Sequence, residues 1–141
     1  MASRISNAAA VAACNAIVDL IDVGGTGTLK IYTGAAPTNV EDAATGTLLA
    51  DITLAATAFG VASDQNPNAQ AALASTPVED TNANATGTAG YFRFVSGGAV
   101  GVIQGACATS GAELNFNSTA ISSGAIVSVT SFTVTVPEVG T

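Results

Sequence analysis

The stretch GYFRFVSGG, residues 90–98, decides how this chain folds. Its side chains alternate between two faces, with Phe92 and Phe94 on one and Tyr91, Arg93 and Val95 on the other. A repeat of two residues is the period of a β-strand, and aromatic and β-branched residues favour strands. The Ser-Gly-Gly sequence that ends the stretch is a hairpin signal. We therefore expect the chain to turn here and to return as a second strand over residues 99–108.

Further short strands are predicted on both sides of this hairpin, separated by turns rich in Gly, Pro and Asn. They cover residues 28–33, 47–55, 57–61, 69–76, 113–117 and 125–136, with a polar loop at 77–87. In the longest of them, Val127 and Val129 share one face, and Ile126, Phe132, Val134 and Val136 share the other. One helix followed by about seven or eight short strands is typical of an antiparallel β-sandwich or jelly roll, so we predict a mainly β fold.

Residues 3–22 are predicted to form a helix, because alanine has the highest helix propensity and a serine can cap the start. The apolar residues form two neighbouring stripes, Ile5, Ala9, Ala12, Ala16 and Leu20 in the first and Val11, Cys14, Val18 and Ile21 in the second. Small side chains let another backbone approach, which leaves two partners open: the chain's own sheet and a neighbouring subunit. The predicted organisation is an N-terminal helix or arm (1–25) and a β-sandwich domain (26–141) in one structural unit.

Charge and composition exclude several classes of function. The 141 residues carry three basic and ten acidic side chains and no histidine, for a formal net charge of −7. Three cations are too few for the phosphates of a nucleic-acid footprint, and anionic membrane surfaces repel an acidic chain. No stretch approaches the roughly 18 apolar residues of a membrane span. Without histidine there is no Ser-His-Asp or Cys-His relay and no imidazole metal ligand.

One asparagine-rich segment has the spacing that opens a calcium-binding loop. Asp80, Asn82 and Asn84 stand at alternate positions there. Such a loop requires Gly and Glu further along, where this chain has Ala85 and Tyr91. We therefore expect a solvated turn and predict no metal site.

The reactive side chains also favour structural roles. Cys14 and Cys107 lie at opposite ends of the chain without CxxC spacing, so two small buried thiols are expected. The single lysine, Lys30, is expected to protect the edge of a strand. No catalytic residue and no cofactor is predicted, and the chain is not expected to be an enzyme.

The composition of the surface favours a permanent protein contact. Charged residues make up only 9% of the chain. Short Ser, Thr, Ala and Asn side chains lose little rotamer entropy when they are immobilised, and an uncharged surface costs little to desolvate. The alternative is a monomer that is merely rich in threonine.

Several segments occur in a characteristic order along the chain. They are AIVDLID at 16–22, GTLKIYTG at 27–34, AATGTLLA at 43–50, TAGYFR at 88–93 and SVTSFTVTVP at 128–137. With these segments, which span nearly the whole chain, the sequence resembles a group of small virion structural proteins of tailed bacteriophages, of the capsid decoration (cement) type. These segments have structural rather than catalytic roles, so the resemblance implies no catalytic residue.

The resemblance implies a β-rich subunit, expected as a homotrimer, on the outside of a phage capsid lattice. Its expected partners are the major capsid protein and further copies of itself, on the virion surface after assembly in the host cytoplasm. We expect Arg4, Ile5 and Val11 in the N-terminal segment to contribute to the contacts. Other virion parts remain as alternatives, namely a head–tail connector or a tail- or fibre-associated subunit. A carbohydrate-binding module is a further alternative, which the scarcity of aromatic residues disfavours.

Overall fold

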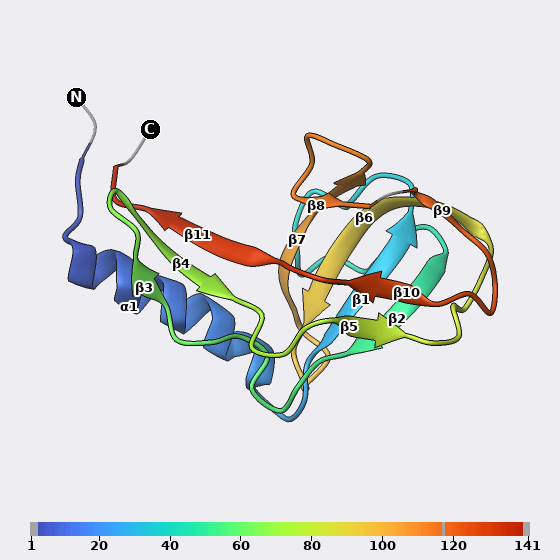
Figure 1. The fold of residues 1–141 in the computed structure, drawn as a ribbon, viewed down its shortest axis with the longest axis horizontal. Helices are drawn as coiled ribbons and strands as arrows, with labels where there is room; N and C mark the ends of the chain where they lie inside the picture. The colour runs from blue at the N-terminus through green and yellow to red at the C-terminus, as the bar shows by residue number, and fades with distance from the viewer. Residues whose placement is uncertain (1–2, 117, 140–141) are drawn as a thin grey trace.

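The computed structural model describes residues 3–116 and 118–139 and confirms a mainly β, sandwich-like fold with one N-terminal helix (Figure 1). The helix α1 spans Asn7–Asp19 and continues as the 3-10 turn η1, Leu20–Asp22. The strands are β1 (Thr28–Thr33), β2 (Leu48–Thr53), β3 (Ser63–Asp64), β4 (Asn68–Ala72), β5 (Val78–Asp80), β6 (Gly87–Val95), β7 (Gly101–Ala108), β8 (Leu114–Asn115), β9 (Ala120–Ile121), β10 (Val127–Val129) and β11 (Thr133–Pro137).

A curled sheet and a two-stranded layer make up the larger part of the molecule, which we call the body. The sheet has the strand order β2-β1-β6-β7-β8, and β9 also pairs with β6. The predicted hairpin is present, since β6 and β7 pair antiparallel with Arg93 opposite Gln104. The pair β5–β10 crosses in front of the sheet (Figure 1). Val78 and Val127 of this second layer join the same buried cluster as Phe92 of the sheet.

One strand pair departs from the predicted antiparallel arrangement. β8 runs parallel to β7, with Cys107 opposite Leu114 and Ala108 opposite Asn115. Residues 109–113 bend through a complete loop, helped by the left-handed conformation of Gly111 (φ 74°), so the chain resumes its earlier direction. The large sheet is therefore antiparallel except at this edge.

The predicted long strand at 125–136 is in fact two strands that serve different parts of the molecule. β10 pairs with β5 in the body, whereas β11 pairs with β4 outside it. Between the two pairs, the backbone N–H of Leu73 donates to the carbonyl of Phe132 at 3.1 Å. Residues 68–80 and 127–137 thus form an interrupted two-stranded ribbon that runs along the molecule.

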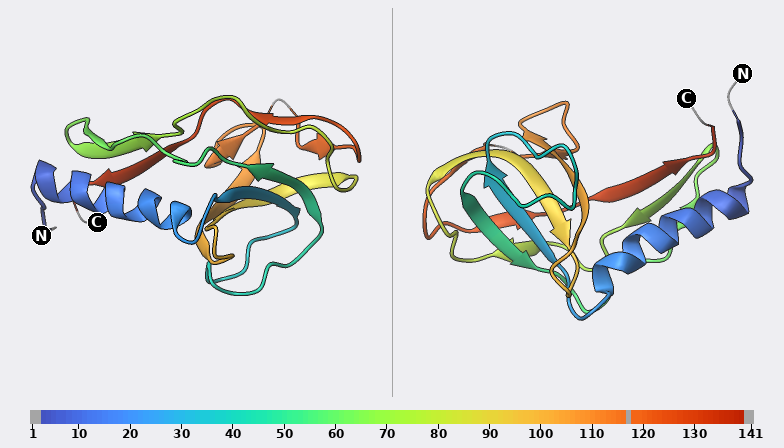
Figure 2. Two further views of the ribbon diagram at one scale, coloured as in Figure 1. Left: turned by 90° about the horizontal axis from the view of Figure 1, so that it is seen from below. Right: turned by 180° about the vertical axis from the view of Figure 1, so that it is seen from behind.

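The second part of the molecule, which we call the extension, consists of α1 and the sheet β11-β4-β3. In both views of Figure 2 it projects to one side of the body. Ser6 caps α1 by accepting from the N–H of Ala9 at 3.1 Å, which confirms the predicted serine cap. The chain leaves the helical region through Gly24 and Gly25, whose φ values of 82° and 130° suit glycine.

Candidate interaction surfaces

The two apolar stripes of the helix face opposite directions, one covered and one exposed, so the prediction that they are neighbours is wrong. Cys14, Val18 and Ile21 of the second stripe are buried. α1 packs on β4 and β11, and the Sγ atom of Cys14 lies 3.6 Å from the carbonyl oxygen of Val134. The chain's own sheet is therefore the partner of this stripe.

The first stripe forms the outer face of α1 and is exposed along its whole length. Its members are Ile5, Ala9, Ala12, Ala16 and Leu20. The side chains at its two ends are large, and 43% of Ile5 and 54% of Leu20 is exposed. We call these five residues the outer face of α1. It contains no charged side chain and no large polar one, which makes it cheap to desolvate.

Polar side chains hold α1 in a fixed position against the chain segment 58–62. The Oδ1 atom of Asn15 accepts a hydrogen bond from the N–H of Ala62 at 2.8 Å. The carboxylate of Asp22 accepts from the N–H of Ala58 at 3.0 Å. Both bonds satisfy backbone donors that would otherwise be buried without a partner. The outer face is thus presented by a helix that is held from behind and at its end.

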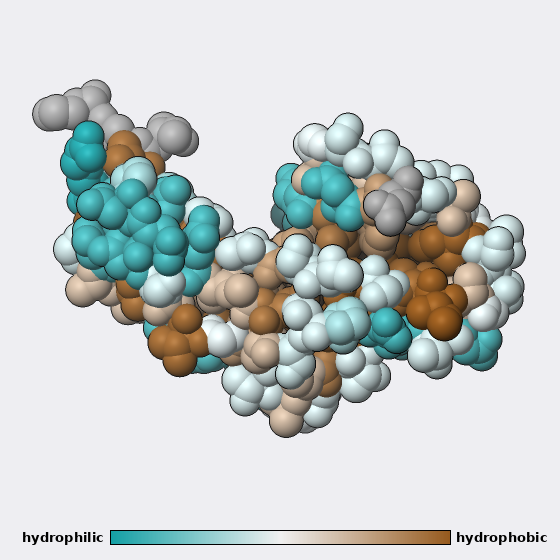
Figure 3. Space-filling view, viewed as in Figure 1, coloured by the Kyte–Doolittle hydropathy of each residue, from teal (hydrophilic) through white to brown (hydrophobic). Residues whose placement is uncertain are grey.

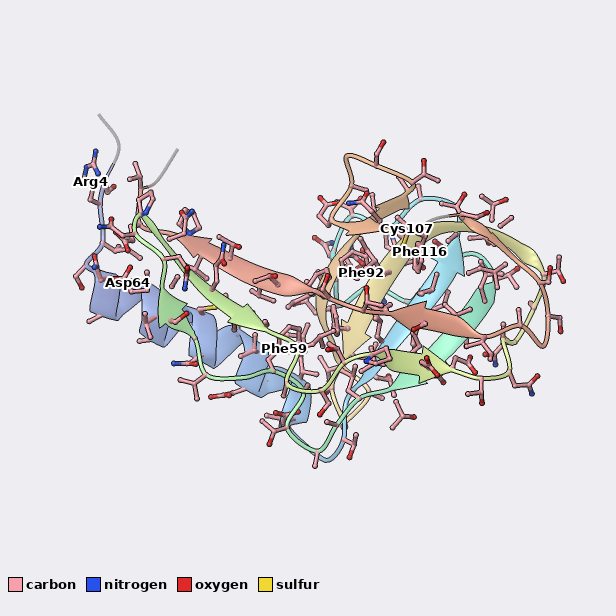
Figure 4. All side chains as sticks on the ribbon, viewed as in Figure 1. Arg4, Phe59, Asp64, Phe92, Cys107 and Phe116 are labelled. Atoms are coloured by element: carbon pink, nitrogen blue, oxygen red, sulfur yellow. The ribbon has the colours of Figure 1, made fainter. Side chains whose placement is uncertain are left out.

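The predicted contact residues do not share one surface. Arg4 lies in an extended segment that bridges Val139, at the end of the extension farthest from the body (Figure 4). Ile5, beside it, opens the outer face of α1. Val11 is half-buried and packs against the core cluster. Arg4 and Ile5 are therefore available to a partner, whereas most of Val11 is occupied within the chain.

A row of polar side chains on the sheet's other face holds the long loop at residues 34–47. Tyr91 Oη donates to the carbonyl of Thr45 at 2.7 Å and accepts from its N–H at 3.0 Å. Arg93 Nη1 donates to the carbonyl of Asp42 at 2.7 Å, and Gln104 Nε2 donates to that of Pro37 at 2.7 Å. Sequence analysis missed this role. The available signal was the conspicuous Tyr-x-Arg alternation opposite the two phenylalanines of the same strand.

Lys30 also lies on this face of the sheet, but not at an edge. β1 pairs with β2 on one side and with β6 on the other, so the expected edge position is wrong. The Nζ atom of Lys30 lies 2.9 Å from Oδ2 of Asp51, its partner in the register with β2. Lysine is tolerated inside the sheet because this carboxylate neutralises it.

A hollow of about 390 Å³ separates β8 from the segment that joins β10 to β11. Phe116 and Phe132 line it, together with polar side chains such as Ser128 and Thr130. Brown apolar side chains are visible deep in this hollow in Figure 3. β8 ends the large sheet and β10 pairs with β5 alone, so each contributes one strand edge that has no strand partner within the described residues.

The segment with calcium-loop spacing serves as a turn. Asp80 Oδ1 accepts from the N–H of Asn82 at 2.9 Å, and its Oδ2 accepts from the N–H of Asp51 at 3.0 Å. Both carboxylate oxygens therefore support the backbone, one within the turn and the other across to β2. In the part of the chain that the structure describes, no group of three His, Cys, Asp or Glu side chains is placed to hold a metal ion.

Both cysteines are buried free thiols, as predicted. Burial, with a smaller contribution from the Glu113 carboxylate, raises the pKa of the Cys107 thiol to about 12. Burial also raises the pKa of Cys14, although a backbone hydrogen bond partly opposes it. At neutral pH both side chains are protonated and therefore unreactive as nucleophiles.

Among residues 3–116 and 118–139, no helix is long and apolar enough to cross a membrane. Comparison of the chain with protein-family models, with curated protein sequences and with solved structures found no match.

Proposed function

We propose that this chain is a non-enzymatic virion structural protein that decorates the outside of a phage capsid lattice and stabilises the assembled shell, as a homotrimer. The observation that carries the proposal is the uncharged, solvent-exposed outer face of α1 on an extension that projects from the β body. The sequence resemblance to capsid decoration proteins supports the same assignment. We propose the major capsid protein as the partner of this face, with Arg4 and Ile5 at its end.

The physical role follows from mass action. A protein that binds only the assembled lattice lowers the free energy of that state and so resists disassembly. Apolar burial on α1 supplies the binding energy, with few ion pairs, because the chain has only three basic side chains. Added salt screens charges but leaves apolar burial largely intact, so binding to the shell depends weakly on salt. Release of the protein from particles at modest salt contradicts this account.

The first test is the copy number of the chain in purified virions, measured by quantitative mass spectrometry against the major capsid protein. A lattice-wide stoichiometry, such as one copy per capsid subunit, supports decoration. A single ring of copies assigns the chain to the neck or tail instead. Absence from the particle refutes a virion role altogether.

A variant of the outer face tests the contact itself. Ala12→Glu places a charge at the middle of the face, while glutamate preserves helix propensity, so the chain folds. We expect at least roughly tenfold weaker binding to particles that lack the protein, since a buried unpaired charge costs more than ~1.4 kcal/mol. Ala36→Glu is the matched control, because Ala36 is an exposed alanine in the loop 34–47. Equal binding by both variants overturns the assignment of this face.

A further inference from the structure

Two of the three basic residues of the chain lie directly opposite each other. Lys30 on β1 and Arg93 on β6 are register partners. Like charges in this position repel each other across the strands. The same row continues on both sides, to Asp51 on β2 and to Gln104 on β7. It therefore reads acid, base, base, amide across the sheet.

Within this row, the charge of Lys30 is balanced but that of Arg93 is not. Lys30 pairs with Asp51 at 2.9 Å. Arg93 is only 5% exposed, and among the described residues no carboxylate lies within ion-pair distance of it. A buried charge without a counter-charge costs several kcal/mol as an order of magnitude. Something else is therefore needed to balance the guanidinium.

The hydrogen bonds of Arg93 leave part of its capacity unused. Nε and Nη2 both donate to Oε1 of Gln104, at 3.2 and 2.8 Å, and Nη1 donates to the carbonyl of Asp42 at 2.7 Å. These acceptors are neutral. A guanidinium has five N–H donors, so two remain without an acceptor within the described part of the chain.

A pocket of about 350 Å³ opens at this point. The sheet lines it with Lys30, Tyr32, Arg93, Val95 and Gly101, and the two flanking loops line it with residues 40–44 and 99–100. Tyr32 is itself held in place, because its ring stacks on Tyr91 with centroids 5.0 Å apart. The volume is at the lower end of the range for small-ligand sites. The pocket thus combines a rigid floor, an unbalanced cation and room for a small group.

We propose that this pocket binds a carboxylate, which the unused N–H groups of Arg93 hold beside Lys30 and Tyr32. A carboxylate matches the planar fork of a guanidinium and supplies the missing charge. It can come from a small free acid or from an acidic side chain of a neighbouring polypeptide. The site is separate from the outer face of α1, so the proposal does not depend on the proposed function.

Two carboxylates of the chain itself also line the pocket and define the competing explanation. Oδ2 of Asp42 already accepts from the backbone N–H and the side-chain amide of Asn39, both at 3.2 Å. Glu41 is exposed and occupies the neighbouring position in the loop. If Glu41 turned inward in solution, it would be an internal counter-ion for Arg93. The experiment has to separate this outcome from binding of an external carboxylate.

The composition of the chain makes the test unusually direct. Arg4 and Arg93 are the two arginines, so a nitrogen-15 spectrum of the arginine Nε–H groups contains two resonances. Arg4→Gln removes one of them and assigns both. The full chain is titrated with sodium acetate and, separately, with sodium chloride to the same ionic strengths. We expect the Arg93 resonance to shift and saturate in the acetate titration but not in the chloride titration. The resonance of Arg4, which is exposed, is expected to change equally in both, because it responds to ionic strength only.

Three outcomes overturn the proposal: no saturable shift at Arg93, an equal shift with chloride, or an equivalent shift of Arg93 on Glu41→Gln substitution without acetate. The last result identifies Glu41 as the counter-ion. The Arg93→Gln variant, titrated alongside and followed by the amide resonances of residues 40–44, is expected to lose the response to acetate. A second titration with the blocked peptide acetyl-Gly-Glu-Gly-amide separates the two sources. Saturation by either probe supports the site, and the tighter probe identifies the source.

Discussion

Phe132 packs against Phe94 with ring centroids 4.9 Å apart, and this contact joins the extension to the body. Phe132 also lies 5.2 Å from Phe92 and 6.3 Å from Phe59, centroid to centroid. Figure 4 places Phe59 and Phe92 close to the point where the ribbon leaves the body. Four of the five phenylalanines therefore form one cluster at the junction.

The first prediction concerns this junction. Phe132→Ala is expected to lower the free energy of unfolding by about 2–3 kcal/mol, because it removes a half-buried ring from edge-to-face contacts and leaves a cavity. Urea unfolding followed by circular dichroism measures the loss. Phe116→Ala is the control, since Phe116 is also half-buried but makes none of the ring contacts of the cluster. An equal loss for both variants shows that the cluster has no special role.

The second prediction concerns the bond between α1 and the segment behind it. Asn15→Ala leaves the N–H of Ala62 without an acceptor, which is expected to cost about 1–2 kcal/mol of stability. Asp19→Ala, on the exposed side of the same helix, is expected to change stability by less than about 0.5 kcal/mol. Thermal unfolding of the two variants provides the comparison. Because alanine raises helix propensity at both positions, a loss at Asn15 is not a propensity effect, and similar results for the two variants contradict the role of the bond to Ala62.

The third prediction is a loss of stability at alkaline pH. The pKa of the Cys107 thiol is about 12 in the folded chain and has an ordinary value of 9.0. Below the ordinary value both states hold the proton, so the full stability is present. Above it the unfolded chain releases the proton and the folded chain does not, which favours unfolding as the pH rises toward 12.

Urea unfolding between about pH 8 and pH 10 measures this effect, and the expected loss from Cys107 is about 1 kcal/mol. Cys107→Ala removes that contribution and flattens the profile. Cys14→Ala retains it, because the Cys107 thiol is unchanged. Identical profiles for the wild type and Cys107→Ala contradict the raised pKa.

The fourth prediction tests the close approach of β6 to the loop that follows β1. A Cβ atom added at Gly90 would overlap the carbonyl oxygen of Gly34, so Gly90→Ala is expected to cost about 2–3 kcal/mol. At Gly60 the added atom meets only the carbonyl of Ala72, at 3.7 Å. Gly60→Ala is therefore expected to leave the urea midpoint nearly unchanged. Full tolerance of Gly90→Ala refutes the close packing of this loop.

The spacing of apolar residues correctly predicted the helix and those strands in which a single periodicity holds along the whole element. The strand predicted at residues 28–33 has the same bounds in the structure, because its apolar residues alternate without interruption. The prediction was less good where pairing is short. β5 lies within the predicted polar loop, and residues 57–61 form only the bridge between Phe59 and Leu73. Such short segments form strands because another strand pairs with them, not because their own composition favours a strand.

The C-terminal ribbon shows the same division within one segment. Its sequence already places Val127 and Val129 on the opposite face from Phe132 and Val134. The structure explains this change of face, because β10 faces the core of the body whereas β11 faces α1. A periodic pattern reports that a side is buried, but it carries no information about which distant element covers it.

The sequence by itself determined the helix, most of the strands, the two helical stripes and the scarcity of charge, because propensity and periodicity are local properties. Only the tertiary structure decided which stripe is covered, that Lys30 lies inside a sheet, and that Arg93 is buried beside a pocket without a carboxylate partner among the described residues. These features depend on contacts between residues that are far apart along the chain. Such contacts are selected by the packing of the whole molecule, where burial and charge balance are satisfied together.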